Sequence, residues 1–317
     1  MTAQNGEARC IVVDWGTTSF RAFLTDDDGA ILDSGETADG IGKIGREDFE
    51  PLLMRNLEAW LRKWSALPVV CLGMITSRSG WIELPYVPCP ADLDALAQGA
   101  HQTSLPNGSP LVFLTGLTDR ARWPYPDVMR GEETQIAGFG LERDATVVLP
   151  GTHSKWARVK DGRITGFQTF VTGEIFALLS QHSFIARSAG QPSSAPVWDA
   201  FERGLSFAAD ERLDAGAFLS MIFSARTGML AGQLAPPEIT DYVSGLVIGC
   251  EFRQAREQGW FDPGTAIGIV GNDGLNERYK RAADAFGLRV IDGGEEAAIR
   301  GALAILNAVQ GASVHAA

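Results

Sequence analysis

Two short segments of the chain combine residue types that can bind the phosphates of a nucleotide. They are residues 11–22 and residues 147–157. Each contains an apolar run, a Gly-Thr pair and a second extended run that leads to an Asp-Gly turn, a pattern typical of a β-hairpin. Glycine lets the backbone approach a ligand closely, and the N–H and hydroxyl groups of such a turn converge on an anion. Two such turns could hold a phosphate chain from both sides, which indicates ATP.

The two turns supply the candidate phosphate ligands. These are Gly16, Thr17, Thr18, Gly151, Thr152 and His153, with Lys155 as an added cation if its side chain faces the ligand and not solvent. Asp14 precedes the first turn and is the candidate to hold Mg²⁺, through water, because Mg²⁺ gives up its hydration shell reluctantly. The alternative role for Asp14 is to end a strand and cap the turn.

The composition limits the partners. The net charge of −12 argues against nucleic acid or an anionic membrane as the main partner. No apolar stretch approaches the roughly 20 residues that cross a bilayer, and the N-terminus lacks a signal-peptide pattern. The four cysteines are scattered, without metal-site spacing. We therefore expect a cytoplasmic protein with small-molecule partners, either a monomer or a homodimer.

The order of the expected elements is repeated along the chain. Residues 10–38 predict a three-stranded meander, residues 47–64 a helix, and residues 68–72 and 111–114 buried strands. Helices are expected at 132–141, 173–179, 239–258, 275–286 and 295–309, with strands at 265–270 and 289–291. Residues 76–90 and 185–240 show no clear periodicity. The repetition predicts two α/β lobes around a cleft.

These motifs resemble the superfamily that includes actin, hexokinase, sugar kinases and the heat-shock chaperone ATPase. Residues 14–18 match its first phosphate motif, residues 149–154 stand where the second belongs, and residues 268–276 resemble its adenosine motif. Residues 131–141 and 293–304 resemble its two connecting helices. The resemblance implies two ribonuclease-H-like lobes with mixed sheets, flanking helices and a central nucleotide cleft. It implies residues 1–130, closed by helix 295–317, as the lobe that binds sugar acid and phosphate, and residues 131–294 as the nucleotide lobe.

A closer resemblance rests on three separated strings. Residues 73–81 with 85–90, residues 130–135 and residues 149–156 are similar to the 2-dehydro-3-deoxygalactonokinase family. That family implies Mg²⁺- and ATP-dependent phosphorylation of the terminal (6-) hydroxyl of 2-dehydro-3-deoxy-D-galactonate, in galactonate or galactose catabolism. In the adenosine motif, Gly271, Asn272 and Gly274 are then expected beneath adenine and ribose.

The resemblance also implies a catalytic base at the start of the first connecting helix, where hexokinases have an aspartate. This chain has Glu132 and Glu133 there, and either can be aligned with the base. An alternative is that both carboxylates only complement the helix dipole.

For the substrate acid, Arg78 is the expected carboxylate ligand, since arginine binds carboxylates in a bidentate manner. Ser77 flanks it, and Trp81 would either stack on the sugar or pack in the lobe. Gly40 is expected in a loop that walls the site. Glu174 would bind sugar hydroxyls or cap a helix.

Other functions remain open at this point. Another sugar, sugar-acid or polyol kinase of the superfamily is one alternative, and a phosphatase acting on polyphosphate or guanosine nucleotides is another. A nucleotide-switched chaperone or filament-forming ATPase belongs to a different class. The sequence does not decide which sugar-acid epimer is preferred.

Overall fold

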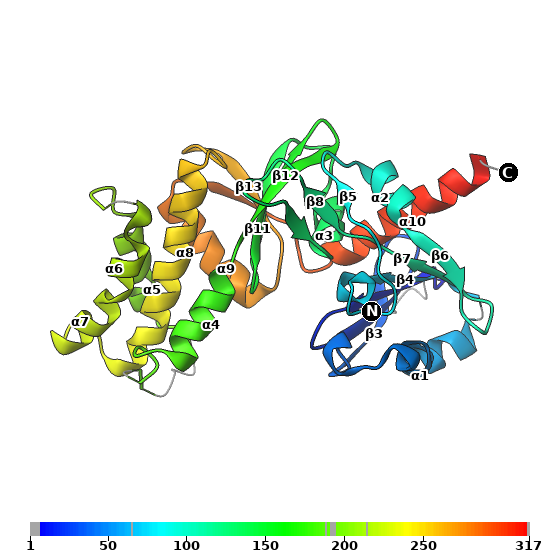
Figure 1. Cartoon of the computed structure of the whole chain (residues 1–317), viewed down its shortest axis with the longest axis horizontal. Coiled ribbons are helices and arrows are strands. Elements are labelled where there is room, and N and C mark those ends of the chain that lie inside the picture. Colours follow the sequence, from blue (N-terminus) through cyan, green and yellow to red (C-terminus); the bar gives the residue numbers. More distant parts are fainter. Residues whose placement is uncertain (1–6, 65, 188, 191–194, 214, 316–317) are drawn as a thin grey trace, which may run out of the picture. The chain divides into compact units, whose positions relative to one another are not determined.

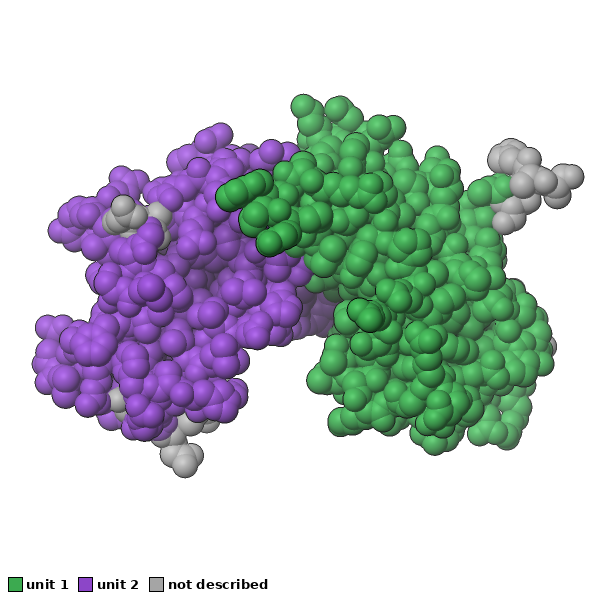
Figure 2. Space-filling model, in the orientation of Figure 1, with its two compact units in different colours: residues 1–144, 159–167, 296–317 green, residues 145–158, 168–295 purple. Residues whose placement is uncertain are grey.

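The computed structural model describes residues 7–64, 66–187, 189–190, 195–213 and 215–315. The chain divides into two compact units, coloured separately in Figure 2. Unit 1 comprises Met1–Asp144, Val159–Phe167 and Glu296–Ala317, and unit 2 comprises Ala145–Arg158 and Gln168–Glu295.

Unit 1 is built on a six-stranded mixed sheet (Figure 1). Its strands, in sheet order, are β3 (Ile31–Thr37), β2 (Phe20–Thr25), β1 (Cys10–Trp15), β4 (Val69–Leu72), β7 (Pro110–Phe113) and β6 (His101–Ser104). The first three form the predicted antiparallel meander, whereas β1, β4 and β7 run parallel. Strands β1 and β4 are buried along nearly their whole length, as expected of central parallel strands.

Helix α1 (Phe49–Lys63) packs its apolar face into the same hydrophobic core as the sheet. The helix forms where the spacing of apolar residues predicted it, and its buried residues are Phe49, Leu52, Leu53, Leu57 and Leu61. Trp15 lies in this core, with edge-to-face contacts to Phe20 and Phe49. The end of β1, which carries Asp14, is therefore held by a large apolar cluster.

Helices α3 (Glu132–Phe139) and α10 (Ala297–His315) cross at very close range in unit 1. A Cβ atom added at Gly138 would lie 1.8 Å from the carbonyl oxygen of Ala297, and one at Gly301 would lie 1.8 Å from that of Thr134. Helix α10 also contacts β1 and β4. The start of α3 is thus fixed relative to the ends of the central strands.

The rest of unit 1 consists of short elements that the sequence pattern did not reveal. Strands β5 (Val87–Pro88), β8 (Leu117–Asp119) and β9 (Asp127–Met129) form a second, three-stranded sheet. Helix α2 (Leu93–Gly99) packs against α10.

Unit 2 repeats the sheet order of unit 1. The strands of this sheet, in order, are β12 (Arg163–Phe170), β11 (Ser154–Lys160), β10 (Ala145–Leu149), β13 (Ala266–Ile269) and β14 (Arg289–Asp292). The end of β11 and most of β12, within Val159–Phe167, are counted with unit 1, and the rest of the sheet with unit 2. The order β12-β11-β10-β13-β14 corresponds to β3-β2-β1-β4-β7, and the last three strands again run parallel. The predicted internal duplication is confirmed at the level of sheet topology.

Helices make up most of the remainder of unit 2. They are α4 (Thr172–His182), α5 (Trp198–Ala209), α6 (Phe218–Ile222), α7 (Ser224–Leu230), α8 (Ile239–Glu257) and α9 (Asp273–Ala285). Helices α5 and α8 lie side by side (Figure 1) and are packed closely through glycines on both.

The border between the units differs from the predicted one. The sequence suggested that the second lobe begins at residue 131, but α3 and the residues up to 144 belong to unit 1. The reason is the close crossing of α3 and α10, which joins residues 132–139 to the helix that packs on the unit 1 sheet.

Candidate active site

The first Gly-Thr turn connects β1 to β2 and is closed by a hydrogen bond from the Gly16 N–H to the Ser19 carbonyl, at 3.0 Å. Thr17 and Thr18 are exposed at its tip. Their backbone and hydroxyl donors are therefore accessible to a ligand, as the sequence pattern predicted.

The loop at Gly40 supports this turn directly. The Ile41 N–H donates to the Gly16 carbonyl and the Gly42 N–H to that of Thr17, both at 3.0 Å. A Cβ atom at Gly40 would lie 2.3 Å from the Thr17 carbonyl oxygen, so only glycine permits this contact. The Trp15 indole N–H donates to the Asp39 carbonyl at 2.7 Å. In unit 1, Gly40 thus packs against the turn.

Asp14 lies at the end of β1 with its side chain 18% exposed. Its carboxylate pairs with the guanidinium of Arg21, which stands opposite it across the β1–β2 ladder. Burial raises the pKa of Asp14, Arg21 lowers it, and the negative charge of Glu132 raises it again. Asp14 and Glu132 therefore interact electrostatically.

Gly73 makes room for the Asp14 carboxylate. Its φ of +86° is a conformation that other residues rarely adopt, and a Cβ atom there would lie 3.1 Å from Asp14 Oδ1. Gly73 directly follows β4, the parallel neighbour of β1. The ends of two central strands and the start of α3 therefore meet around one carboxylate.

The two glutamates at the start of α3 occupy different environments. Glu133 is 1% exposed, and its carboxylate accepts hydrogen bonds from the Gly131 N–H at 2.8 Å and the Thr134 hydroxyl at 3.0 Å. Burial, with the nearby charge of Glu132, raises the pKa of Glu133 to about 8. Glu132 is half-buried and accepts the Arg130 N–H at 3.0 Å.

Glu132 and Asp14 line one small cavity of about 150 Å³ in unit 1. Its walls are Asp14, Gly16, Leu72, Gly73, Met74, Arg130, Gly131, Glu132 and Gln135. Glu133 does not line it. The structure thus brings together the predicted metal ligand, the first glycine of the phosphate turn and one of the two candidate bases.

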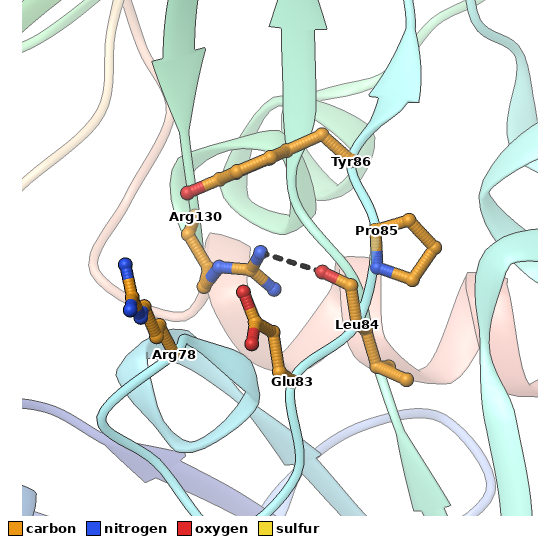
Figure 3. Close-up of a pocket in the computed structure, with 6 residues that line it drawn as sticks. All are labelled: Arg78, Glu83, Leu84, Pro85, Tyr86 and Arg130. Carbon is orange, nitrogen blue, oxygen red and sulfur yellow. Dashed lines mark hydrogen bonds between the residues drawn. The ribbon is translucent and has the colours of Figure 1, made fainter.

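A larger cavity of about 450 Å³ lies beside the irregular segment after β4 (Figure 3). It is lined by Arg78, Glu83, Leu84, Pro85, Tyr86 and Arg130. The volume is within the range of about 300–1,000 Å³ that is usual for small-molecule sites. Arg130 lines both cavities, whereas Arg78 lines only the larger one.

Two predicted substrate residues lie elsewhere in unit 1. Trp81 stacks on Phe49 at 6.3 Å between ring centroids and meets Phe113 edge-to-face at 5.3 Å, so it packs against the lobe core and does not line the larger cavity. Ser77 is 8% exposed, and its hydroxyl has no hydrogen-bond partner among the described residues.

In unit 2, the second turn carries Gly151, Thr152 and His153, of which the last two are exposed. The Glu174 N–H donates to the Thr152 carbonyl at 3.0 Å, and the His153 and Glu174 side chains are hydrogen-bonded at 2.7 Å. Glu174 thus ties the start of α4 to this turn. Lys155 is 4% exposed and donates from Nζ to the His153 carbonyl at 3.1 Å, so its side chain does not face solvent.

A buried carboxylate stabilises the strand that follows the second turn. Glu251 on α8 is 3% exposed and accepts hydrogen bonds from the Ser154 hydroxyl at 2.8 Å, the Trp156 indole at 2.7 Å and the Tyr279 hydroxyl at 2.7 Å. Burial raises its pKa, and these donors, with Thr172, lower it. No local sequence pattern predicts this network, because it joins residues from four elements.

The predicted adenosine turn follows β13 in unit 2. Asn272 caps α9 by accepting the Leu275 N–H at 3.0 Å, and the Asn276 side chain donates to the Gly271 carbonyl at 2.8 Å. Gly274 lies exposed in the first turn of α9. The strand, glycine turn and helix are those that the motif predicts.

No group of three or more His, Cys, Asp or Glu side chains in the described ranges has the arrangement of a metal centre. None of the helices in the described part is long and apolar enough to span a membrane.

The duplicated sheet order and the Gly-Thr turns define an α/β protein of the actin-like ATPase fold. An activator of 2-hydroxyisocaproyl-CoA dehydratase from Clostridium difficile shares this fold, with a TM-score of 0.50 at 13% identity over 96% of this chain and 97% of that one. The carboxylate pair beside the turn in unit 1 suits a kinase of this fold class.

The particular family is given by sequence. Residues 14–305 match the family model of 2-keto-3-deoxy-galactonokinase, and the chain belongs to that family of sugar-acid kinases. A relative in Rhizobium meliloti strain 1021, described as a 2-dehydro-3-deoxygalactonokinase, is 34% identical over 92% of this chain and 94% of the relative. A relative of the same description in Escherichia coli K12 is 33% identical over 89% of this chain and 92% of the relative. A crystal structure described in the same way, from Sinorhizobium meliloti, has a TM-score of 0.80 at 31% identity, covering 96% of this chain and 99% of that one.

These comparisons confirm the predicted fold class, family and type of enzyme. A kinase family implies ATP as the phosphoryl donor and a sugar acid as the acceptor. The family match favours the kinase over the two alternatives, a phosphatase and a nucleotide-switched ATPase of the same fold.

Proposed function

We propose that the chain transfers the γ-phosphoryl group of Mg·ATP to the terminal (6-) hydroxyl of 2-dehydro-3-deoxy-D-galactonate, in galactonate or galactose catabolism. The observation that carries this proposal is the cavity in which Asp14 and Glu132 lie beside the first phosphate turn. Phosphoryl transfer needs positioned groups and charge neutralisation more than covalent chemistry from the protein.

Glu132 is the proposed base. Its carboxylate would accept the proton of the 6-hydroxyl as that oxygen bonds to the γ-phosphorus and the bond to the β–γ bridging oxygen breaks, releasing ADP. A base must reach the proton that it removes, and Glu132 lines the cavity whereas Glu133 is buried and does not line it. The Arg130 N–H holds one Glu132 oxygen, which orients the carboxylate.

Asp14 is the proposed residue that holds Mg²⁺. Mg²⁺ is usually bound by one or two carboxylates together with waters and substrate phosphates, and Asp14 supplies such a carboxylate beside Gly16. When bound, the ion neutralises charge on the phosphates. Arg21, which pairs with Asp14, adds a cation at the same strand end.

Each of the two turns is proposed to supply phosphate ligands. Gly16, Thr17 and Thr18 in unit 1, and Gly151, Thr152 and His153 in unit 2, present exposed or partly exposed donors for the β- and γ-phosphates. Gly271, Asn272 and Gly274 would lie beneath the nucleoside. We also propose a cytoplasmic location, where ATP is available and the four free thiols remain reduced.

A coupled ADP-release assay tests the proposal. The purified protein is given Mg·ATP with 2-dehydro-3-deoxygalactonate, its gluconate epimer, or neutral six-carbon sugars. Selective turnover of the galactonate compound supports the proposal. Equal or better kcat/KM with a neutral sugar would contradict it, because no role would remain for a carboxylate ligand.

A further inference from the structure

The larger cavity of unit 1 contains two arginines without an acidic partner. Among the described residues, no carboxylate lies within 4 Å of the Arg130 or Arg78 guanidinium, and Glu83 has no ion pair either. The lining therefore carries a net positive charge of one, in a protein whose net charge is −12. Such a local cationic site is what an anionic substrate needs on this acidic chain.

Within the described part of the chain, the groups that hold the Arg130 side chain are neutral. Nη1 donates to the Thr76 hydroxyl at 2.7 Å and Nη2 to the Leu84 carbonyl at 3.0 Å, and the guanidinium lies 4.3 Å from the centre of the Tyr86 ring (Figure 3). The Thr76 hydroxyl in turn donates to the Leu114 carbonyl at 2.9 Å. The Arg130 Nε–H has no partner among the described residues.

A half-buried cation without a counter-charge is unfavourable unless a ligand supplies one. Arg78, by contrast, is exposed, and no partner orders its side chain within the described part of the chain. A fixed guanidinium loses less conformational entropy on binding than a free one. Arg130 is therefore the better preorganised of the two cations.

Arg130 also connects the larger cavity to the smaller one. Arg130 lines both, and its backbone N–H donates to the Glu132 carboxylate. A substrate whose anionic end binds the guanidinium would extend toward Asp14 and Glu132. Arg130 can thus position the substrate through its guanidinium and the base, Glu132, through its backbone N–H.

Building on the proposed function, we infer that Arg130, and not Arg78, is the principal ligand of the substrate's carboxylate and adjoining keto oxygen, and that it selects a 2-keto acid over a neutral sugar. Tyr86 holds the plane of its guanidinium. Arg78 contributes a weaker, solvent-screened attraction at the same cavity.

The test compares Arg130→Gln, Arg130→Lys and Arg78→Gln, with Arg62→Gln on α1, 77% exposed, as a control for the loss of one positive charge. For each variant, the KM of the acid, the KM of ATP and the kcat ratio between the acid and a neutral analogue are measured. Titration calorimetry without ATP gives the affinity for the acid, and the melting temperature reports folding.

Arg130→Gln should raise the KM and weaken the binding of the acid about 10- to 100-fold, as expected for a lost charge-assisted hydrogen bond. The KM of ATP should stay within about threefold. Arg130→Lys should recover only part of the loss, because an ammonium cannot bind in a bidentate manner. Arg78→Gln should cost less than about fivefold.

The inference is overturned if Arg130→Gln leaves the affinity for the acid within threefold of wild type, or if Arg78→Gln weakens it more. Failure of the wild-type protein to phosphorylate any sugar acid would instead overturn the proposed function. If Arg130 variants do not fold, Tyr86→Phe and Tyr86→Leu replace them. The phenylalanine keeps the ring and should retain affinity, whereas the leucine should lose several-fold; equal affinities would overturn the inference.

Discussion

Replacing Glu133 by glutamine should stabilise the protein at neutral pH. The wild-type carboxyl group is 1% exposed and has a pKa of about 8 against an ordinary value of 4.5. Glutamine has the same shape, and its amide can accept the Gly131 N–H while donating to the Thr134 hydroxyl, the two groups that Glu133 contacts. The variant therefore keeps both hydrogen bonds and has no proton to lose.

The sign and size of the effect follow from proton linkage. Between pH 4.5 and 8 the unfolded chain releases the Glu133 proton whereas the folded chain retains it, so the wild-type free energy of unfolding falls as the pH rises. One pH unit corresponds to about 1.4 kcal/mol, which gives about 3 kcal/mol at pH 7 and an upper limit of about 5 kcal/mol above pH 8. At pH 5 the two proteins should differ by less than about 1 kcal/mol.

Urea unfolding and melting temperatures at pH 5, 7 and 8.5 measure this difference. Glu142→Gln, an exposed carboxylate of the same unit, is the matched control and should leave the pH dependence unchanged. Identical pH profiles for wild type and Glu133→Gln would refute the reasoning, because they would show that Glu133 titrates normally in the folded protein.

Two further substitutions test the supports of the phosphate turns. Gly40→Ala places a Cβ atom about 2.3 Å from backbone atoms of Thr17 and Thr18, so it should raise the KM of ATP and lower the free energy of unfolding by about 1–3 kcal/mol. The control Gly35→Ala, where a Cβ atom has nothing within 4 Å, should change neither quantity. An unchanged KM of ATP in Gly40→Ala would show that the turn does not depend on this loop. Glu251→Ala leaves the buried donors of Trp156 and Tyr279 unpaired, so the free energy of unfolding measured in a urea titration should fall by about 3–5 kcal/mol. A loss below about 1 kcal/mol would contradict the stabilising role assigned to the Glu251 network.

Local signals explain which elements could be predicted from the sequence. The meander of β1 to β3 follows from its turn residues, and α1 follows from the 3.6-residue spacing of its apolar side chains. Strands β5, β8 and β9 were missed because they are only two or three residues long, and because β5 pairs with β8, which is distant in sequence. The position of α3 in unit 1 depends on a helix crossing near the C-terminus, which no local pattern reveals.

The sequence likewise predicted part of the candidate site. Asp14 and the two turns lie where the motifs placed them, but the sequence could not separate Glu132 from Glu133, because burial decides between neighbouring residues of one helix. Arg21 could have been found, since it is opposite Asp14 in a hairpin centred on the Gly-Thr-Thr turn. Arg130 could be proposed as a substrate ligand only from its tertiary contacts with Thr76 and Tyr86.

The most direct test of the central claim is the kcat of Glu132→Gln beside that of Glu133→Gln, with Mg·ATP and 2-dehydro-3-deoxygalactonate. If Glu132 is the base, its glutamine variant should lose about 10²–10⁴-fold in kcat with little change in either KM. Glu133→Gln should stay within a few-fold of wild type, since its carboxyl group does not line the cavity. A Glu132→Gln protein with wild-type kcat, or an equal loss in Glu133→Gln, would contradict the assignment.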